Sequence, residues 1–118
     1  MVYTPQWMRR PGAVGERLRI SPRRCCVTHA LRHAGSVYQV TIGYFADGHA
    51  GEVLISDPRI GSEIAHLAHY TAVLLSIAMQ YRVPIEVMRG AVGRHTSTGV
   101  AHSVTGAVLD LVAEESAR

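Results

Sequence analysis

Apolar and polar positions alternate over three stretches near the middle of the chain, residues 25–33, 37–45 and 51–56. A period of two residues is typical of strands that bury one face. The face expected to be buried in the second stretch carries Tyr38, Val40, Ile42 and Tyr44. Turn-forming residues fill the gaps at 34–36 and 46–49, and short gaps of this kind join neighbouring strands as hairpins. The pattern predicts an antiparallel meander of three strands.

The pattern then changes to a helical one. Ser62 is suited to cap a helix that runs from Ile64 to Tyr81, because its hydroxyl can accept from a free N–H of the first turn. Pro84 suits the first turn of a second helix, residues 84–92, and a third is expected at 103–115. Three strands followed by three helices predict an α+β fold in two layers, with the long helix buried and two shorter ones beside it.

The long helix carries no Asp, Glu, Lys or Arg from Ile64 to Tyr81. A helix that is apolar on most faces must be buried on most faces. One small sheet can cover only part of it, and large apolar surfaces that remain uncovered usually mark interfaces. We therefore expect a homo-oligomer that forms through the helix Ile64–Tyr81.

Charge divides the chain of 118 residues into two parts. Residues 1–24 contain six Arg and one Glu, a net charge of +5, and irregularly spaced Pro and Gly. Residues 25–118 contain six Arg and eight acidic residues, a net charge of −2. We interpret 1–24 as a basic N-terminal arm and 25–118 as a single domain. An acidic protein or nucleic acid would suit the arm; a solvated leader without a partner is the alternative.

Neither a signal peptide nor a membrane span is predicted. The first residues lack an apolar core segment, and the densest apolar run of the long helix, 72–79, is too short to cross a bilayer. These features predict a cytoplasmic protein that does not bind membranes.

The residue types that usually carry chemistry do not form a known catalytic pattern. Cys25 and Cys26 are adjacent and are expected to be two buried thiols at a strand start, without a disulfide or zinc site. His66 and His69 share one side of the long helix and could hold a metal if a third ligand approached; core or interface histidines are the preferred interpretation. We predict no metal, no cofactor and no catalytic residue, and hence no enzyme.

Two loops are better suited to bind an anion. The first delivers a guanidinium and free backbone N–H groups to the start of the long helix, an arrangement that favours phosphate. The second supplies further donors just before the third helix. The candidate ligand-binding residues are Arg59, Gly61 and Ser62 in the first loop and Arg94, His95, Thr96, Ser97 and Thr98 in the second. Simple capping and a solvated turn are the alternative. Replacing either arginine is expected to cost little folding stability, as is usual for exposed loop residues.

Three segments together resemble a known family: Thr41 to Ile55, the pair Gly61-Ser62, and Ser76 to Glu86 with its Gln-Tyr-Arg-Val-Pro run. They are similar to the TSCPD-type accessory domain of adenosylcobalamin-dependent (class II) ribonucleotide reductases, which also occurs as small free-standing proteins in bacteria and prophages. The signature cysteine of that family is absent, since Thr96 to Gly99 stands nearby and no Cys follows Cys26.

The resemblance implies a nucleotide-related role without transferring catalytic positions. Our first expectation is a non-catalytic accessory or regulatory module, related to ribonucleotide reductase, that binds a nucleotide or another phosphorylated small molecule. The second is a phage-type anti-defence protein that sequesters a nucleotide signal. The third is a pure interaction module that docks through its basic arm.

Overall fold

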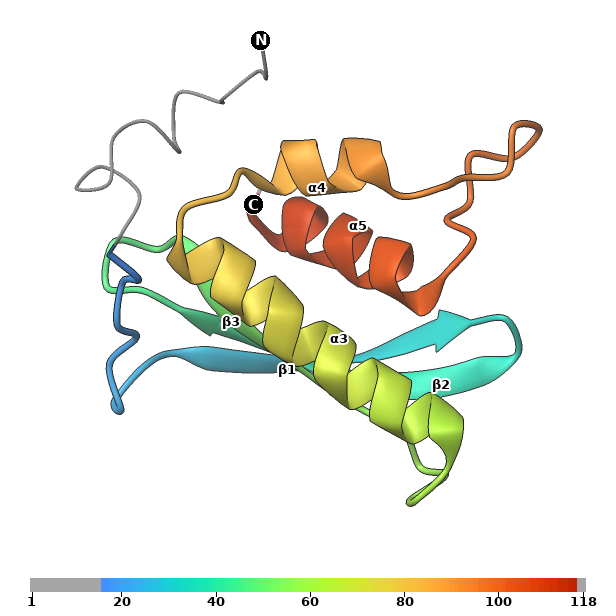
Figure 1. Cartoon of the computed structure of the whole chain (residues 1–118), viewed down its shortest axis with the longest axis horizontal. Helices are drawn as coiled ribbons and strands as arrows, with labels where there is room; N and C mark the ends of the chain where they lie inside the picture. The colour runs from blue at the N-terminus through green and yellow to red at the C-terminus, as the bar shows by residue number, and fades with distance from the viewer. Residues whose placement is uncertain (1–15, 117–118) are drawn as a thin grey trace, which may run out of the picture.

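The structure, a computed structural model, describes residues 16–116 and contains one sheet and three helices in that range (Figure 1). The strands are β1 (Cys26–His33), β2 (Ser36–Tyr44) and β3 (Ala50–Ser56), in the spatial order β1-β2-β3. The helices are α3 (Glu63–Gln80), α4 (Ile85–Ala91) and α5 (Val104–Ser116). The predicted α+β fold is confirmed, with element ends within two residues of those expected. Of the predicted arm, residues 1–15 lie outside the described residues.

Both hairpins are antiparallel and turn through left-handed backbone. Ala34 and Gly35 turn the chain between β1 and β2 with φ values of 50° and 79°, a conformation that glycine adopts at little cost and that alanine adopts at a cost of about 1–2 kcal/mol. Val40 in the middle of β2 lies opposite His29 on one side and Ile55 on the other. This register places the alternating apolar residues of β2 on one face, as predicted.

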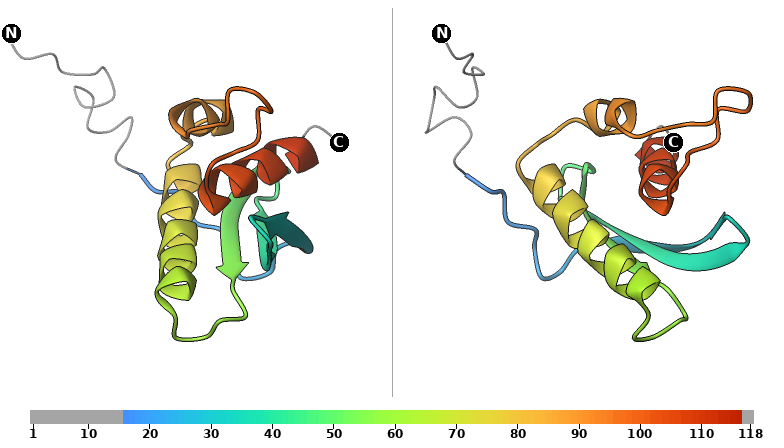
Figure 2. Two further views of the ribbon diagram at one scale, coloured as in Figure 1. Left: turned by 90° about the vertical axis from the view of Figure 1, so that its right-hand side faces the viewer. Right: turned by 45° about the vertical axis from the view of Figure 1, so that its right-hand side comes forward.

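Helices α3 and α5 cover the same face of the sheet (Figure 2) and enclose a single core. The largest of the fully buried side chains in this core come from β2, β3 and α5. They are Val40, Ile42, Val53, Val108, Leu109 and Val112. The opposite face of the sheet carries exposed residues such as Thr28 and Leu54, and neither α3 nor α5 covers it (Figure 2). Arg24 covers part of this face, where its Nε donates to the Glu52 carboxylate at 2.6 Å.

Helix α3 lies along β3, the edge strand, and bonds to three of its outward backbone groups. The Ser76 hydroxyl accepts from the N–H of Val53 and donates to its carbonyl, each at 3.0 Å. One turn later the Gln80 amide donates to the carbonyl of Gly51, also at 3.0 Å. Because an edge strand presents unpaired backbone groups, these two polar side chains replace a fourth strand.

Helix α4 is attached differently, since it has no fully buried residue. Ile85, Met88 and the following Val92 pack partly buried against the core. Arg89 also donates to Asp110 of α5 at 3.0 Å. The helix is therefore held by a partly buried apolar edge and by a charged contact to α5.

Candidate functional site

Arg59, in the first predicted loop, is bound by a neighbouring carboxylate. Its backbone N–H and Nε both donate to Asp57 Oδ1, at 2.8 and 2.9 Å, and one Nη donates to Oδ2 at 2.6 Å. The same Nη group lies 3.2 Å from the Tyr38 hydroxyl. Hydrogen bonds from Arg59 lower the pKa of Asp57, whose side chain is fully shielded from solvent. These contacts argue against the expectation that Arg59 contributes little to folding, because its removal would deprive a shielded carboxylate of its charged partner.

The rest of the first loop serves the helix start. Gly61 has a φ of 79°, in the left-handed region that glycine tolerates. The predicted N-cap is confirmed, since the Ser62 hydroxyl accepts from the N–H of Ala65 at 3.1 Å. Arg59 and Ser62, two of the three predicted residues in this loop, thus already have hydrogen-bond partners within the chain.

Arg94, in the second predicted loop, is bound in the same way. It donates through both terminal nitrogens to the Asp110 carboxylate and through one of them to the carbonyl of Gly99, the latter at 3.2 Å. These contacts raise the pKa of Arg94 and lower that of Asp110, chiefly through the side-chain hydrogen bonds between them. From these contacts we expect Arg94 to contribute to folding stability, contrary to the expectation that its replacement would cost little.

The remaining residues of this loop form a small hairpin. His95 N–H donates to the carbonyl of Val100, and Gly99 N–H donates to the carbonyl of His95, each at 2.8 Å. The residues between them, Thr96, Ser97 and Thr98, are exposed at the tip. Their hydroxyls face solvent at one end of the molecule.

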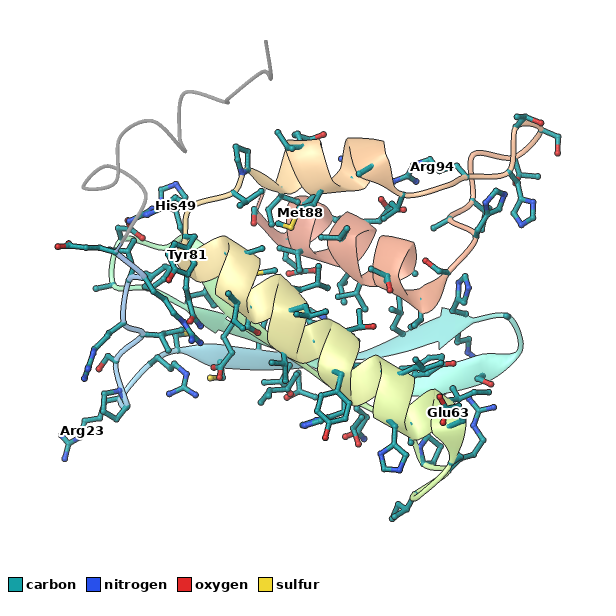
Figure 3. All side chains as sticks on the ribbon, in the orientation of Figure 1. Arg23, His49, Glu63, Tyr81, Met88 and Arg94 are labelled. Carbon is teal, nitrogen blue, oxygen red and sulfur yellow. The ribbon has the colours of Figure 1, made fainter. Side chains whose placement is uncertain are left out.

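The two predicted loops do not come together within the chain. Figures 1 and 2 show the loop before α3 and the loop between α4 and α5 at separate corners of the fold, and in Figure 3 the labels of Glu63 and Arg94 lie far apart. Each loop is thus a separate candidate, and neither has an arginine free of a carboxylate contact.

A third region contains Arg17 and Arg19, which form no ion pair with any residue that the structure describes. Segment 16–24 runs past the end of α3, where the N–H of Leu18 donates to the Gln80 carbonyl at 2.9 Å and Arg17 Nε donates to the Gln80 side chain. A cavity of 560 Å³ opens there, with Arg17, Arg19 and Gln80 in its wall. Its volume falls in the range of about 300–1,000 Å³ that is typical of small-molecule sites.

Charge in this cavity is dominated by its arginines. Glu52 also lines it, but Arg24 Nε donates to this carboxylate at 2.6 Å. Among the described residues, neither Arg17 nor Arg19 forms an ion pair. The cavity therefore presents two guanidinium groups to a ligand and a carboxylate paired with Arg24 at one side, while the buried Gln80 amide bonds Arg17 and Gly51.

Sequence reasoning placed these arginines in an irregular arm and missed their docking. The available signal was the short alternation Arg17-Leu18-Arg19-Ile20, in which the arginines are exposed and the apolar residues are half-buried. In the sequence, Gln80 stands out only as part of the Gln-Tyr-Arg-Val-Pro run that carries the family resemblance. Its side chain in fact links the arm, α3 and β3.

The cysteines differ from expectation, and no metal cluster is evident. Cys25 and Cys26 are both exposed free thiols, because they lie where the chain enters an edge strand. Within residues 16–116, no three His, Cys, Asp or Glu side chains lie close enough to hold a metal ion. None of the helices in this range is long and apolar enough to span a bilayer.

The fold and the basic cavity define a small α+β protein with a candidate anion site. The chain is 38% identical, over 72 residues, to a vitamin B12-dependent ribonucleotide reductase of Rhodopirellula baltica. The aligned segment is 61% of this chain but only 7% of the reductase. The chain is thus similar to a small part of such an enzyme. No protein-family model and no solved structure matches it.

Proposed function

We propose that this chain is a non-catalytic accessory module, related to B12-dependent ribonucleotide reductase, that binds a nucleotide or another phosphorylated small molecule. The observation that carries the proposal is the 560 Å³ cavity with Arg17, Arg19 and Gln80 in its wall. The similarity to part of a reductase supplies the context in which a nucleotide is the expected ligand.

The electrostatics favour this cavity over the two predicted loops. A phosphate that bound Arg59 or Arg94 would have to share the guanidinium with Asp57 or Asp110, and like charges at short distance repel. At Arg17 and Arg19 no such competition exists within the described residues. Arginine suits this role because its planar donor groups can contact two phosphate oxygens at once.

The predicted loops stay second candidates for the same ligand. The exposed hydroxyls of Thr96, Ser97 and Thr98, and the backbone around Gly61, could contact a phosphate without displacing a carboxylate. A nucleotide-sequestering protein of the anti-defence type would need the same binding chemistry, so ligand identity, rather than the fold, separates the two functions.

Thermal denaturation with a panel of mono-, di-, tri- and cyclic nucleotides tests the proposal. A ligand that binds only the native state adds about 2.7 kcal/mol at a hundredfold excess over its Kd, which corresponds to a rise in Tm on the order of ten degrees for this length. Arg19→Gln is expected to abolish most of the rise, because Arg19 lines the cavity and its side chain has no polar partner within residues 16–116.

Arg23→Gln is the matched control. Arg23 is also exposed and also forms no ion pair within the described residues, but it does not line the cavity. A nucleotide shift that survives Arg19→Gln would move the ligand to another part of the chain. No shift with any nucleotide at millimolar concentration would contradict the nucleotide-binding function.

A further inference from the structure

Helix α3 carries two apolar stripes on opposite sides. The inner stripe packs into the core through Ala68, Ala72, Leu75 and Met79, all of them buried. The outer stripe consists of Leu67, Tyr70, Leu74, Ile77 and Tyr81. Its spacing of three and four residues in alternation is that of a coiled-coil seam.

The outer stripe has the larger side chains and is the more exposed. Leu67 is 59% exposed, Tyr70 61% and Leu74 68%, while Tyr81 at the helix end is 39% exposed. In both views of Figure 2, no described segment covers the side of α3 turned away from the core. On ordinary monomers the largest exposed apolar patch covers about 300–600 Å², and such patches often mark interfaces.

Spacing and charge indicate what covers the stripe. A seam with this repeat fits another helix that carries the same repeat, and a two-fold interface needs one self-complementary surface. The charged residues nearest the stripe are Glu63 before it and Arg82 after it, and Figure 3 shows Glu63 and Tyr81 at opposite ends of α3. Arg82 is exposed and also contacts Asp47 at 3.2 Å.

These charges distinguish the two orientations that a helix pair can adopt. A parallel pair would place Glu63 beside Glu63 of the second copy and would align the two helix dipoles. Because Arg82 stacks on Phe45 and contacts Asp47, the charge that matters is Glu63: an antiparallel pair separates the two Glu63 carboxylates and opposes the dipoles, and both effects are favourable. With Leu74 at the two-fold axis, Leu67 faces Tyr81 of the second copy.

We propose that a second copy of this chain packs antiparallel against the outer stripe of α3, with Leu74 at the centre of the interface. This surface does not include the basic cavity, so the proposal is independent of nucleotide binding. The stripe supplies the apolar centre, and the Glu63 charge and the helix dipole set the orientation.

Analytical ultracentrifugation of the full chain tests the association. We expect a dimer at micromolar concentration, and Leu74→Glu is expected to raise the dissociation constant about 100-fold, as is typical when a central apolar anchor is lost. Val87→Glu is the matched control, because Val87 is an equally exposed apolar helix residue on α4, outside the stripe. Circular dichroism verifies that both variants keep the helical content of the parent chain.

Cysteine cross-linking tests the orientation. In a background in which Cys25 and Cys26 are replaced by Ser, Leu74→Cys should form a disulfide with itself, because its two copies meet at the axis. Tyr81→Cys should cross-link with Leu67→Cys but not with itself. A monomeric parent chain, or a dimer that Leu74→Glu leaves intact, would overturn the proposal, and self-linking of Tyr81→Cys would overturn the antiparallel arrangement.

Discussion

At the scale of single residues, the neighbour of an arginine decides whether it binds a ligand or stabilises the fold. Arg59 and Arg94 each hold a carboxylate, Asp57 and Asp110 respectively. Arg19 has no such neighbour within the described residues. The sequence shows three similar arginines in loops or irregular segments, and it does not show which of them a carboxylate approaches.

Replacing Arg59 by Ala is expected to lower Tm by roughly 5–10 °C, because the shielded Asp57 carboxylate loses the two hydrogen bonds donated by the guanidinium. The backbone bond from residue 59 survives the substitution and keeps part of the stabilisation. Differential scanning calorimetry measures the change. Arg23→Ala, in an exposed position without an ion pair in the described part of the chain, should leave Tm unchanged.

The same pair gives a pH dependence with a defined sign. Since Arg59 lowers the pKa of Asp57 in the folded state, the pair stabilises the fold above the unfolded pKa of about 3.9. That stabilisation is lost as the pH falls below this value and the carboxylate takes up a proton. Arg59→Ala should therefore flatten the fall of Tm between roughly pH 5 and pH 2. An identical slope in both proteins would contradict the role assigned to the pair.

At the scale of elements, the contact between α3 and β3 depends on two polar side chains one turn apart. Ser76 is buried and bonds both backbone groups of Val53, which is itself fully buried. Ser76→Ala would leave a buried donor and acceptor unpaired, at a cost of about 1–3 kcal/mol each in unfolding free energy before relaxation. Chemical denaturation should show a loss of at least this size.

Ser56→Ala is the control for that substitution. Ser56 lies at the end of the same strand and is exposed, so its hydroxyl can exchange one water partner for another. Its removal should change the unfolding free energy by less than about 0.5 kcal/mol. Equal effects from the two serines would show that the Ser76 bonds do not hold α3 to the strand.

The elements themselves could be predicted because each has a local signal. Alternation marked the strands, Ser62 marked the start of α3, and Pro84 preceded α4. The candidate site could not be predicted in the same way, since it joins Arg17 to Gln80 across 63 positions. Contacts over such separations depend on how elements pack, and a sequence pattern reports only on the element that contains it.

At the scale of the whole molecule, the segment of 72 residues that aligns with the reductase covers 61% of this chain and 7% of that enzyme. We expect no cobalamin-dependent reduction of a ribonucleotide by this chain alone. Its two cysteines are the neighbours Cys25 and Cys26, at the start of β1, and the sequence contains no third cysteine that could complete a reducing set. Assays with adenosylcobalamin, a dithiol reductant and each ribonucleotide, with a B12-dependent reductase as positive control, measure this directly. Turnover above background would refute the expectation.

The bonds from α3 to β3 affect how the sheet itself could grow. In the part of the chain that the structure describes, side chains of α3 bond Gly51 and Val53 on the outer edge of β3, while the outer edge of β1 receives no such bonds. If two copies joined their sheets edge to edge through β1, both outer ends of the joined sheet would again be strands bonded to α3. The α3 side chains would then hinder further pairing, so this fold disfavours open-ended fibre growth through its native sheet.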